Sequence, residues 1–417
     1  MKDKYDVIVC GGGFAGTAAA VAAARQGAEV LLLDKSGFLG GAAGNCQINP
    51  FMPFSTKING VKTDLSAGLF TQITESLSAL GGLHPNGFTF NEEILKLALD
   101  RLTARHGVTV LFHTYITGVV KDGDQLQAVS CVNKSGAQTY YADFFIDATG
   151  DADVAAFAGC PYQIGRESDH LCQPMTLCFR IADVDVDTVF QTLGEINALY
   201  AEKCRAGEIK NPREDVLCMR HMSGNILHVN STRVIRKSPF SVSDRSDAER
   251  EAREQVFELF TFLKENCQGF EHAVLLPSGP EIGVRESRMI TGLYTLTQED
   301  LKSCTKFSDG IAACSYDIDI HNPDGSGTSH YYFKEGEYYT IPYRCLVPQK
   351  ASNLLAAGRC ISGTHEAQAS YRIMPVCCTL GEAAGIAAAL AVQHGCSNAD
   401  VDPDTLRRIL QENGAFI

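Results

Sequence analysis

No two of the 16 cysteines in this 417-residue chain have the C-x-x-C spacing. Zinc ribbons and cysteine-ligated iron–sulfur clusters usually need such close pairs, so the sequence argues against both kinds of metal site. The cysteines instead lie in apolar runs, such as Val9-Cys10 and Val376-Cys377-Cys378-Thr379. Buried thiols in the reducing environment of the cytoplasm are therefore expected.

Long hydrophobic runs and an excess of positive charge are also missing. The longest stretch of small and apolar residues, 385–392, is too short to cross a bilayer. The first strand is expected to begin by Tyr5, which leaves no room for a signal peptide. The net charge of -13 argues against nucleic acid or an anionic membrane as the main partner. The composition predicts a soluble, cytoplasmic protein of two or three domains and leaves its oligomeric state open.

There is no internal repeat, no low-complexity tract and no second G-x-G-x-x-G motif, so no separate nicotinamide domain is expected. The single motif is Gly11-Gly12-Gly13-Phe14-Ala15-Gly16. It follows an apolar run that ends at Cys10 and opens an Ala-rich stretch, after which a second apolar run ends at Asp34. Strand, glycine turn, helix, strand and acid therefore follow in the order of a dinucleotide-binding βαβ unit.

Each part of this unit has a physical role. Gly11 allows the tight turn, Gly13 lets the backbone approach a pyrophosphate, and Gly16 lets the helix lie close to the strand. The phosphates would rest on unpaired N–H groups at the positive end of the helix. Asp34 is placed to accept hydrogen bonds from a ribose diol. The unit alone predicts a dinucleotide and does not separate NAD from FAD.

Further elements are expected along the chain. Helices are expected at 64–80 and 92–106, the second capped by Asn91, and at 185–206 and 247–266, the last opened by a capping box at Ser246. Strands are expected at 108–112, 116–121, 126–132 and 140–146, which form a meander, and at 175–181 and 353–356. An Ala/Gly-rich helix follows at 375–393.

Three features outside the βαβ unit favour FAD. The unit lies at the N-terminus, the meander leads into Asp147-Ala148-Thr149-Gly150-Asp151, and a late strand returns with 354–358 before the Ala/Gly-rich helix. We predict an α/β fold in which a Rossmann-like FAD-binding domain, with a parallel sheet and a β-meander, carries an inserted α+β substrate domain. The expected boundaries are 1–159 and 346–417 for the FAD-binding domain and 160–345 for the substrate domain.

With these stretches and Gly-Val-Arg-Glu-Ser-Arg at 283–288, the sequence resembles flavoproteins that have the glutathione-reductase type of FAD-binding domain. More narrowly, it is similar to FAD-dependent oxidoreductases related to the fumarate reductase and succinate dehydrogenase flavoprotein branch. The resemblance implies that the first motif holds the ADP pyrophosphate. It also implies that Asp34, where Glu is more common, holds the adenosine ribose.

The resemblance assigns further residues to the cofactor. A Gly-Asp pair usually ends the late strand, but here the pair is Gly358-Arg359, so the role of that acid is open and Arg359 is placed to contact phosphate. The helix near Pro375 would point its positive end at the flavin pyrimidine ring. The residues expected to bind FAD are Gly11, Gly13, Phe14, Ala15, Gly16, Asp34, Lys35, Gly41, Thr149, Gly150, Asp151, Gly358, Arg359, Met374 and Pro375.

A flavin transfers hydride through its N5, so the protein must place a substrate carbon there, hold the substrate's charge and exchange a proton. Arg285 and Arg288 can clamp a carboxylate, contact flavin phosphate or pair with Glu286. Asp319 can orient His321 as a general acid or base, or both can belong to a polar strand face. The residues expected to take part in catalysis are His321, His365, Arg288, Arg285, Tyr371 and Arg372.

Cys46 lies where the succinate-type branch attaches its flavin covalently. The attached residue in that branch is His, so the sequence favours non-covalent FAD.

We predict an FAD-dependent oxidoreductase that transfers hydride between flavin N5 and a small polar molecule, either a carboxylate or a sugar-like compound. Its electron donor or acceptor is unknown, and no metal is expected. Two alternatives remain. The single glycine motif permits an NAD-linked dehydrogenase, although the late strand and helix argue against it. The second alternative is a partner subunit that binds a flavin without catalysing a reaction. The grouping of Arg and His residues argues against it.

Overall fold

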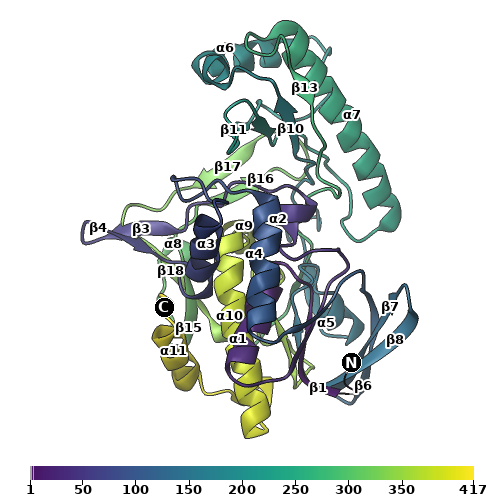
Figure 1. The fold of residues 1–417 in the computed structure, drawn as a ribbon, viewed down its shortest axis with the longest axis vertical. Helices are drawn as coiled ribbons and strands as arrows, with labels where there is room; N and C mark the ends of the chain where they lie inside the picture. Colours follow the sequence, from purple (N-terminus) through teal and green to yellow (C-terminus); the bar gives the residue numbers. More distant parts are fainter. Residues whose placement is uncertain (1, 3) are drawn as a thin grey trace.

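The structure, a computed structural model, describes residue 2 and residues 4–417. Its largest sheet has seven strands in the order β5-β2-β1-β8-β7-β6, with β19 paired to β8 beside this path (Figure 1). These strands are β1 (Lys4–Cys10), β2 (Val30–Leu33), β5 (Thr109–Leu111), β6 (Tyr115–Asp122), β7 (Gln125–Asn133), β8 (Gly136–Asp147) and β19 (Leu354–Ala356).

β8 joins the parallel and antiparallel parts of this sheet. Its second half pairs in parallel with β1 and β19, and its first half forms an antiparallel ladder with β7. The meander therefore comprises β6, β7 and β8. The strand expected at 108–112 was wrongly placed in the meander, because β5 pairs in parallel with β2. The predicted α/β fold with a parallel sheet and a meander is confirmed.

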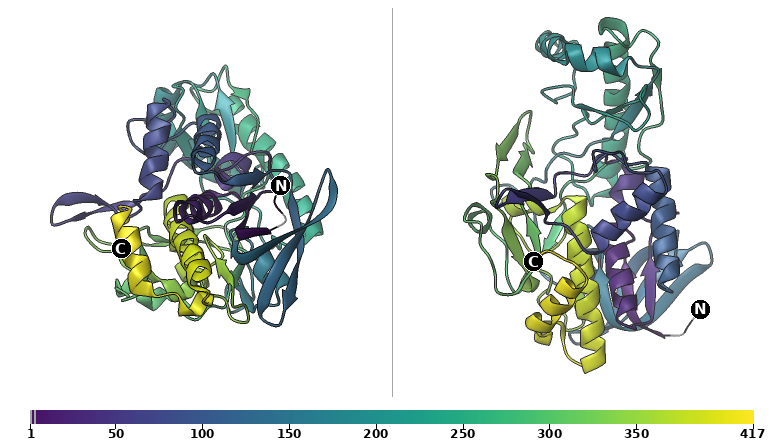
Figure 2. Two further views of the ribbon diagram at one scale, coloured as in Figure 1. Left: turned by 60° about the horizontal axis from the view of Figure 1, so that its bottom comes forward. Right: turned by 60° about the vertical axis from the view of Figure 1, so that its left-hand side comes forward.

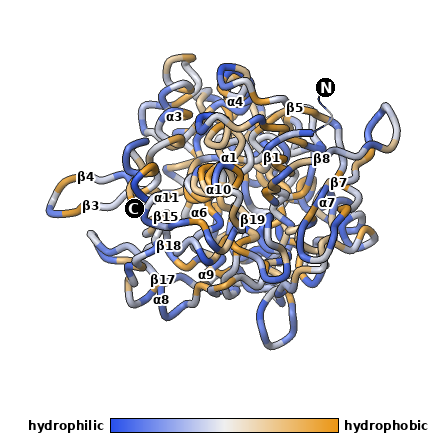
Figure 3. Tube along the Cα trace, turned by 90° about the horizontal axis from the view of Figure 1, so that it is seen from below, coloured by the Kyte–Doolittle hydropathy of each residue, from blue (hydrophilic) through white to orange (hydrophobic). Residues whose placement is uncertain are grey.

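Two Ala/Gly-rich helices, α1 (Phe14–Arg25) and α10 (Met374–His394), pack closely against one another. A Cβ atom on Gly381 would lie 2.0 Å from the carbonyl oxygen of Ala15, and one on Gly385 would lie 2.2 Å from that of Ala19. The two backbones can approach this closely only because these positions have no side chain. Figure 3 shows both helices as largely hydrophobic segments at the centre of the molecule.

α10 is longer than the apolar stretch noted in the sequence. Its 21 residues and mean hydropathy of 1.6 would suffice to cross a membrane by length and composition alone. However, 89% of its most apolar window is buried inside the protein, where it packs on the sheet and on α1. Its apolar surface is therefore used in the core.

Two helices complete this side of the molecule, α3 (Leu69–Ala79) and α4 (Glu92–Arg105). Asn91 caps α4 as predicted, because its side chain accepts from the N–H groups of Glu93 and Ile94. α3 begins five residues later than expected. Asp64 belongs to β4 (Val61–Asp64), which forms a β-hairpin with β3 (Ser55–Ile58), and α3 starts only after its N-cap Gly68, whose φ is +66°.

A second hydrophobic core lies within residues 175–284 and forms a cap that stands away from the main sheet (Figures 1 and 2). Its sheet has the order β11-β12-β10-β13. The elements are β10 (Phe179–Ala182), α6 (Val186–Arg205), β11 (Cys218–Arg220), β12 (Leu227–Val229), α7 (Val242–Asn266) and β13 (Val274–Leu275). The capping box expected at Ser246 was wrong, since α7 already begins at Val242 and is capped by Ser241.

The segment after the cap returns to the main core. β15 (Gly310–Cys314) and β18 (Tyr339–Pro342) pair with each other, and their buried residues belong to the same hydrophobic cluster as α1 and α10. The domain boundaries stay a prediction. The remaining elements are α2 (Ala42–Asn45), α5 (Asp153–Phe157), β9 (Tyr162–Ile164), β14 (Arg288–Ile290), α8 (Gln298–Lys302), β16 (Ile318–His321), β17 (Thr328–Tyr331), α9 (His365–Tyr371) and α11 (Pro403–Glu412), with short 3-10 turns at Tyr343–Cys345 and Asn398–Asp400.

All 16 cysteines are free thiols and most are buried, as their apolar surroundings predicted.

Candidate functional site

An elongated cavity of about 370 Å³ lies at the carboxyl ends of four parallel strands, β1, β2, β8 and β19. Ligands of open parallel sheets bind at this edge. The cavity extends from the end of β2 to the first turn of α10. Most residues predicted to bind the cofactor line it, namely Gly11, Gly13, Phe14, Ala15, Asp34, Lys35, Gly41, Thr149, Gly150, Asp151, Gly358, Arg359 and Met374.

Two predicted cofactor residues do not line the cavity. A Cβ atom on Gly16 would lie 1.7 Å from the carbonyl oxygen of Gly11, so Gly16 lets α1 pack on the glycine turn. Pro375 is buried in the first turn of α10, where its fixed φ suits the start of a helix. The structure thus shows a role in backbone packing for both, and their contact with the cofactor stays a prediction.

The glycine turn leaves an open cradle at the start of α1. Gly11 has a φ of +100°, and a Cβ atom there would lie 2.4 Å from the carbonyl oxygen of Ala148. The nearest atom to a Cβ placed on Gly13 is 3.8 Å away, on Gly41. No side chain caps the N-terminus of α1, so its first N–H groups are free to bind an anion.

Asp34 follows β2 and is almost buried. Its carboxylate accepts hydrogen bonds from the backbone N–H groups of Gly12 and Ser36. Each carboxylate oxygen has further lone pairs, so these bonds orient Asp34 and leave it able to accept from a ribose hydroxyl. The next residue, Lys35, forms an ion pair of 2.6 Å with Glu281, which joins this end of the cavity to the cap.

The loop after β8 is held by Asp147, whose importance the sequence did not reveal. The fully buried carboxylate accepts from the N–H and hydroxyl of Thr149 at 3.1 and 2.7 Å and from the N–H of Ala155 at 2.9 Å. Burial raises the pKa of Asp147 to about 6. These bonds fix the backbone of Thr149 and Gly150 along the cavity wall.

Arg359, in the position where an acid was expected, forms an ion pair with Asp151. Its Nη2 donates to Oδ1 of Asp151 at 2.6 Å, and the Ser287 hydroxyl donates to the same oxygen at 2.7 Å. Burial opposes the charge, but Arg359 and Ser287 hold the pKa of Asp151 below its ordinary value. The Nε of Arg359 is buried without a hydrogen-bond partner, and Arg359 lines the cavity.

The other end of the cavity lies at the N-terminus of α10. No side chain caps this helix, and Met374 and Cys377 line the cavity. Cys46 lies in the wall as well, where its Sγ is 3.7 Å from the carbonyl oxygen of Ile282. Burial raises the pKa of the Cys46 thiol to about 12, so it is protonated.

Of the six predicted catalytic residues, only Arg372 lines the cavity. Its Nη2 donates to the carbonyl oxygen of Asp319 at 3.2 Å and lies 3.5 Å from the Asp319 carboxylate. Its Nε is buried without a partner. Tyr316 also donates to this carboxylate, at 3.2 Å. Burial opposes the charge of Asp319, but contacts from His321 and Arg372 lower its pKa below the ordinary range.

Arg285 lies close to Arg372, and the charge of Arg372 contributes to its lowered pKa. Its Nη1 donates to the carbonyl oxygen of Pro174 at 2.7 Å and to the hydroxyl of Thr176. Both acceptors are neutral, and no described carboxylate forms an ion pair with Arg285. Burial, together with the charge of Arg372, lowers the pKa of Arg285 to about 9.

The two predicted catalytic histidines lie outside the cavity lining. His321 is buried, and burial and the charge of Arg285 lower its pKa to about 3, which opposes the expected role as an acid or base at neutral pH. The Nδ1 of His365 lies 2.8 Å from the carboxylate of Glu286, whose other oxygen accepts from the N–H of Gln173. This buried pair joins α9 to the segment after the cap.

The side chains of Tyr371 and Arg288 also form hydrogen bonds to other groups of the protein. The Tyr371 hydroxyl donates to the carbonyl oxygen of Ile361 at 3.1 Å, and the side chain is fully buried. Arg288 donates to the carbonyl oxygen of Asp151 and the carboxylate of Asp153 at 2.8 and 2.9 Å. These contacts give both residues a role in packing and loop support, and their catalytic roles stay a prediction.

Sequence reasoning missed Arg245, Glu281 and Val284, which bring the cap to the cavity wall. No local motif marks Arg245 or Glu281, and Val284 lies in the 283–288 stretch without having been assigned to the site, because all three meet the cavity only when the cap is folded.

The lining fits a dinucleotide. The open cradle at Gly13 and the uncapped N-termini of α1 and α10 offer free N–H groups, and the buried Nε atoms of Arg359 and Arg372 lack partners. Such donors suit the pyrophosphate and the polar edge of a flavin.

Comparison with known proteins finds curated relatives that match part of the chain. Over 198 residues the chain is 26% identical to a digeranylgeranylglycerophospholipid reductase of Methanocella arvoryzae, covering 45% of this chain and 48% of the relative. It is 42% identical over 67 residues to a vinyl phenol reductase of Lactiplantibacillus plantarum, covering 15% and 14%. The chain thus spans about half the length, or less, of these curated relatives.

Among solved structures, the flavin-dependent halogenase CmlS is similar with a TM-score of 0.50 and 13% identity, covering 99% of this chain and 62% of that one. At this identity the likeness shows the fold alone. Residues 6–410 match the family described as FAD dependent oxidoreductase. The chain therefore belongs to the FAD dependent oxidoreductase family and is an enzyme that uses FAD.

Proposed function

We propose that this oxidoreductase acts on a small organic carboxylate and that Arg285 and Arg372 hold its carboxyl group. Bound FAD would supply hydride chemistry at its N5. The observation that carries the proposal is the position of Arg372 in the wall of the α10 end of the cavity, with Arg285 near it but outside the lining. There, neither Arg285 nor the Nε of Arg372 has an anionic partner.

The charges around this end support an anionic substrate. Arg213 pairs with Asp215 at 2.7 Å, Arg233 with Glu214 at 3.3 Å and Arg372 with Asp319 at 3.5 Å. His321 is neutral at pH 7, and Asp319, whose charge acts on Arg285, is shared with Arg372, so the positive charge of Arg285 is only partly balanced. A buried, unbalanced charge is costly, and a carboxylate offers both charge and two acceptor oxygens.

A sugar-like substrate is the second candidate from the sequence, and the same observation disfavours it. A neutral sugar would satisfy hydrogen bonds but would leave the charge of Arg285 unbalanced. The phospholipid in the name of the Methanocella relative is not carried over, because the match covers only 48% of that relative. Both named relatives are reductases, which favours the direction in which the substrate is reduced.

We also propose that FAD lies as in the glutathione-reductase type of binding domain. Its adenosine ribose would lie at Asp34, its pyrophosphate at the start of α1 and its flavin ring at the start of α10. The free N–H groups at both helix ends support this direction. The buried arginines are compatible with a relationship to the fumarate reductase and succinate dehydrogenase branch, which we retain as part of the proposal.

In this proposal, residues of the chain bind the substrate and orient it. Arg285 and Arg372 fix the carboxylate, so that the adjoining carbon lies near the flavin end of the cavity. Val284 and Met374 contribute apolar wall there and exclude water. Asp319 keeps Arg372 in place.

An anaerobic screen tests the proposal. FAD-loaded protein, oxidised or reduced with dithionite, is mixed with saturated and unsaturated carboxylic acids and with the matching primary amides. We expect at least one acid to bleach or restore the flavin absorbance with saturation, and its amide to do so at least tenfold less well. Equal activity with acid and amide, or activity with neutral sugars only, would contradict a carboxylate substrate.

A further inference from the structure

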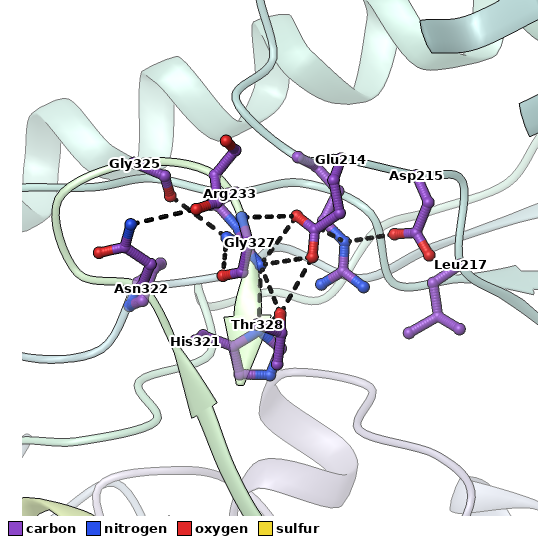
Figure 4. A network of polar contacts seen from close by, with 12 residues as sticks. Glu214, Asp215, Leu217, Arg233, His321, Asn322, Gly325, Gly327 and Thr328 are labelled. Carbon is purple, nitrogen blue, oxygen red and sulfur yellow. Dashed lines mark hydrogen bonds and ion pairs between the residues drawn. The ribbon is translucent and has the colours of Figure 1, made fainter. Parts of the chain in front are cut away.

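Arg233 is a buried arginine of the cap that reaches the β16–β17 hairpin (Figure 4). Its backbone is fixed to α7, because Gln255 accepts from its N–H at 2.7 Å and donates to its carbonyl oxygen at 3.0 Å. Its Nη1 donates to the carbonyl oxygens of Gly325 and Gly327 at 3.2 and 2.9 Å. The guanidinium group is therefore held from two sides.

The other nitrogen of this group determines the proton position on His321. Nη2 of Arg233 lies 3.2 Å from Nδ1 of His321 and 3.3 Å from the carboxylate of Glu214 (Figure 4). A guanidinium group only donates hydrogen bonds and the Asp319 carboxylate beside Nε2 only accepts them, so Nδ1 is the acceptor and carries no proton. The proton of the neutral ring is therefore on Nε2.

That proton points at the carboxylate that holds Arg372. Nε2 of His321 lies 3.4 Å from Oδ2 of Asp319, and the same oxygen lies 3.5 Å from Nη2 of Arg372. Arg372 lines the FAD cavity. A continuous series of polar contacts thus leads from the cap, through Arg233, His321 and Asp319, to the cavity wall.

We propose that Arg233 is a positioning residue for Arg372, acting through the neutral Nε2–H tautomer of His321 and the Asp319 carboxylate. Without Arg233, the ring can take a proton on Nδ1. Asp319 would then turn toward the imidazolium and hold Arg372 less firmly. The inference does not depend on which substrate the enzyme uses.

Charged groups from several elements surround the His321 ring. They are Asp319 on its own strand, Arg233 and, beside it, Glu214 from the cap, Arg285 from the segment after the cap, and Arg372 from the turn before α10. Thr328 of β17 adds a neutral hydroxyl 3.2 Å from Nδ1. Three arginines oppose protonation of the ring and two carboxylates favour it, so loss of one arginine moves the balance toward the imidazolium.

The proton position is measured by ¹⁵N NMR of the FAD-loaded protein labelled at its 11 histidines, with His321→Gln to assign the signal. In the native protein we expect Nδ1 of His321 unprotonated and Nε2 protonated from pH 5 to pH 8. In Arg233→Met we expect Nδ1 to gain a proton within that range, and Arg233→Lys should restore the native pattern in part. A protonated Nδ1 in the native protein would overturn the proposal.

The effect on Arg372 is measured as the midpoint potential of bound FAD. Arg372→Met should lower it, because a positive charge near the flavin favours the reduced anion, and Arg233→Met should lower it by a smaller step. Arg236→Met is the matched control, since Arg236 also joins the cap to this hairpin, through Asp324, but does not contact His321. An unchanged potential in Arg233→Met or in Arg372→Met, or an equal shift in Arg236→Met, would overturn the proposal.

Two substitutions at residue 321 keep the test usable if Arg233→Met does not fold. The Gln side chain can donate to Asp319 as Nε2–H does, whereas the shorter Asn side chain reaches only the Arg233 side. We expect His321→Gln to keep a potential near the native one and His321→Asn to shift it as Arg233→Met would. The opposite order would overturn the proposal.

Discussion

Arg359 donates from Nη2 to Oδ1 of Asp151 at 2.6 Å and so joins the end of β19 to the loop after β8 along the FAD cavity. The sequence places an arginine where related flavoproteins carry an acid. The structure supplies the acid from Asp151, on a neighbouring strand end. The Nε of Arg359 has no protein partner, which leaves a donor for the cofactor.

Arg359→Ala should weaken FAD binding by roughly 10- to 100-fold, equivalent to about 1.4–2.7 kcal/mol. The change removes one donor to the cofactor and leaves the Asp151 carboxylate mostly buried and unpaired. The dissociation constant is measured by quenching of FAD fluorescence on addition of apoprotein.

Arg344→Ala is the matched control, because Arg344 pairs with Asp309 outside the cavity. A loss of FAD affinity as large in Arg344→Ala would show that the effect of Arg359→Ala is not local to the cofactor.

Gly385→Ala should lower the free energy of unfolding by about 3 kcal/mol, since overpacking of a close contact costs about 1–3 kcal/mol or more. The added methyl group would lie 2.2 Å from the carbonyl oxygen of Ala19 and would force α10 away from α1. Gly194→Ala in α6, where nothing lies within 4 Å, should instead raise stability by about 0.5–1 kcal/mol. Urea denaturation of the FAD-loaded proteins measures both, and equal effects would contradict the packing argument.

The cofactor half of the site could be predicted from the sequence because each FAD-binding residue follows a strand or opens a helix. Gly11, Asp34 and Thr149 have positions that local patterns fix. Arg285 and Arg372 were also named from the sequence, but their nearness to each other and to Asp319 could not be predicted, because the three come from separate segments that meet only in the folded chain. His321 was chosen for its place beside Asp319 and His365 for its place after the late strand, and neither local pattern shows the contacts of these rings with Arg233 and Glu286.

Glu382 should make stability fall as the pH rises through 4.5 to 7. Burial in α10 raises the pKa of its carboxyl from 4.5 to about 7, although it accepts a hydrogen bond from the N–H of Leu69. In this window the unfolded chain releases the proton and the folded chain retains it, so the folded state loses up to about 3 kcal/mol relative to the unfolded state.

Glu382→Gln stays neutral and can still accept from Leu69, so it should gain stability relative to the native protein between pH 5 and pH 8. Urea denaturation at both pH values measures this gain, with Glu412→Gln, an exposed change in α11, as the control. A gain that is the same at both pH values would show that Glu382 does not titrate in this window.

FAD should leave the protein on denaturation, because burial keeps the Cys46 thiol protonated and a protonated thiol is a poor nucleophile. Acid precipitation should leave the flavin in the supernatant. A yellow pellet that persists after washing would show covalent attachment, and its loss in Cys46→Ser would assign the bond to Cys46.

An anaerobic titration of the native enzyme and of Arg285→Met, with the carboxylate found in the screen, tests the proposed carboxylate site most directly. We expect Arg285→Met to retain FAD but to need at least a 100-fold higher concentration of acid to change the flavin absorbance. This corresponds to a loss of about 2.7 kcal/mol in the free energy of binding of the acid. We also expect Arg285→Lys to fall between the two, because a lysine keeps the charge but not the fork of donors. Equal titration curves for the native enzyme and Arg285→Met would contradict the proposed carboxylate site.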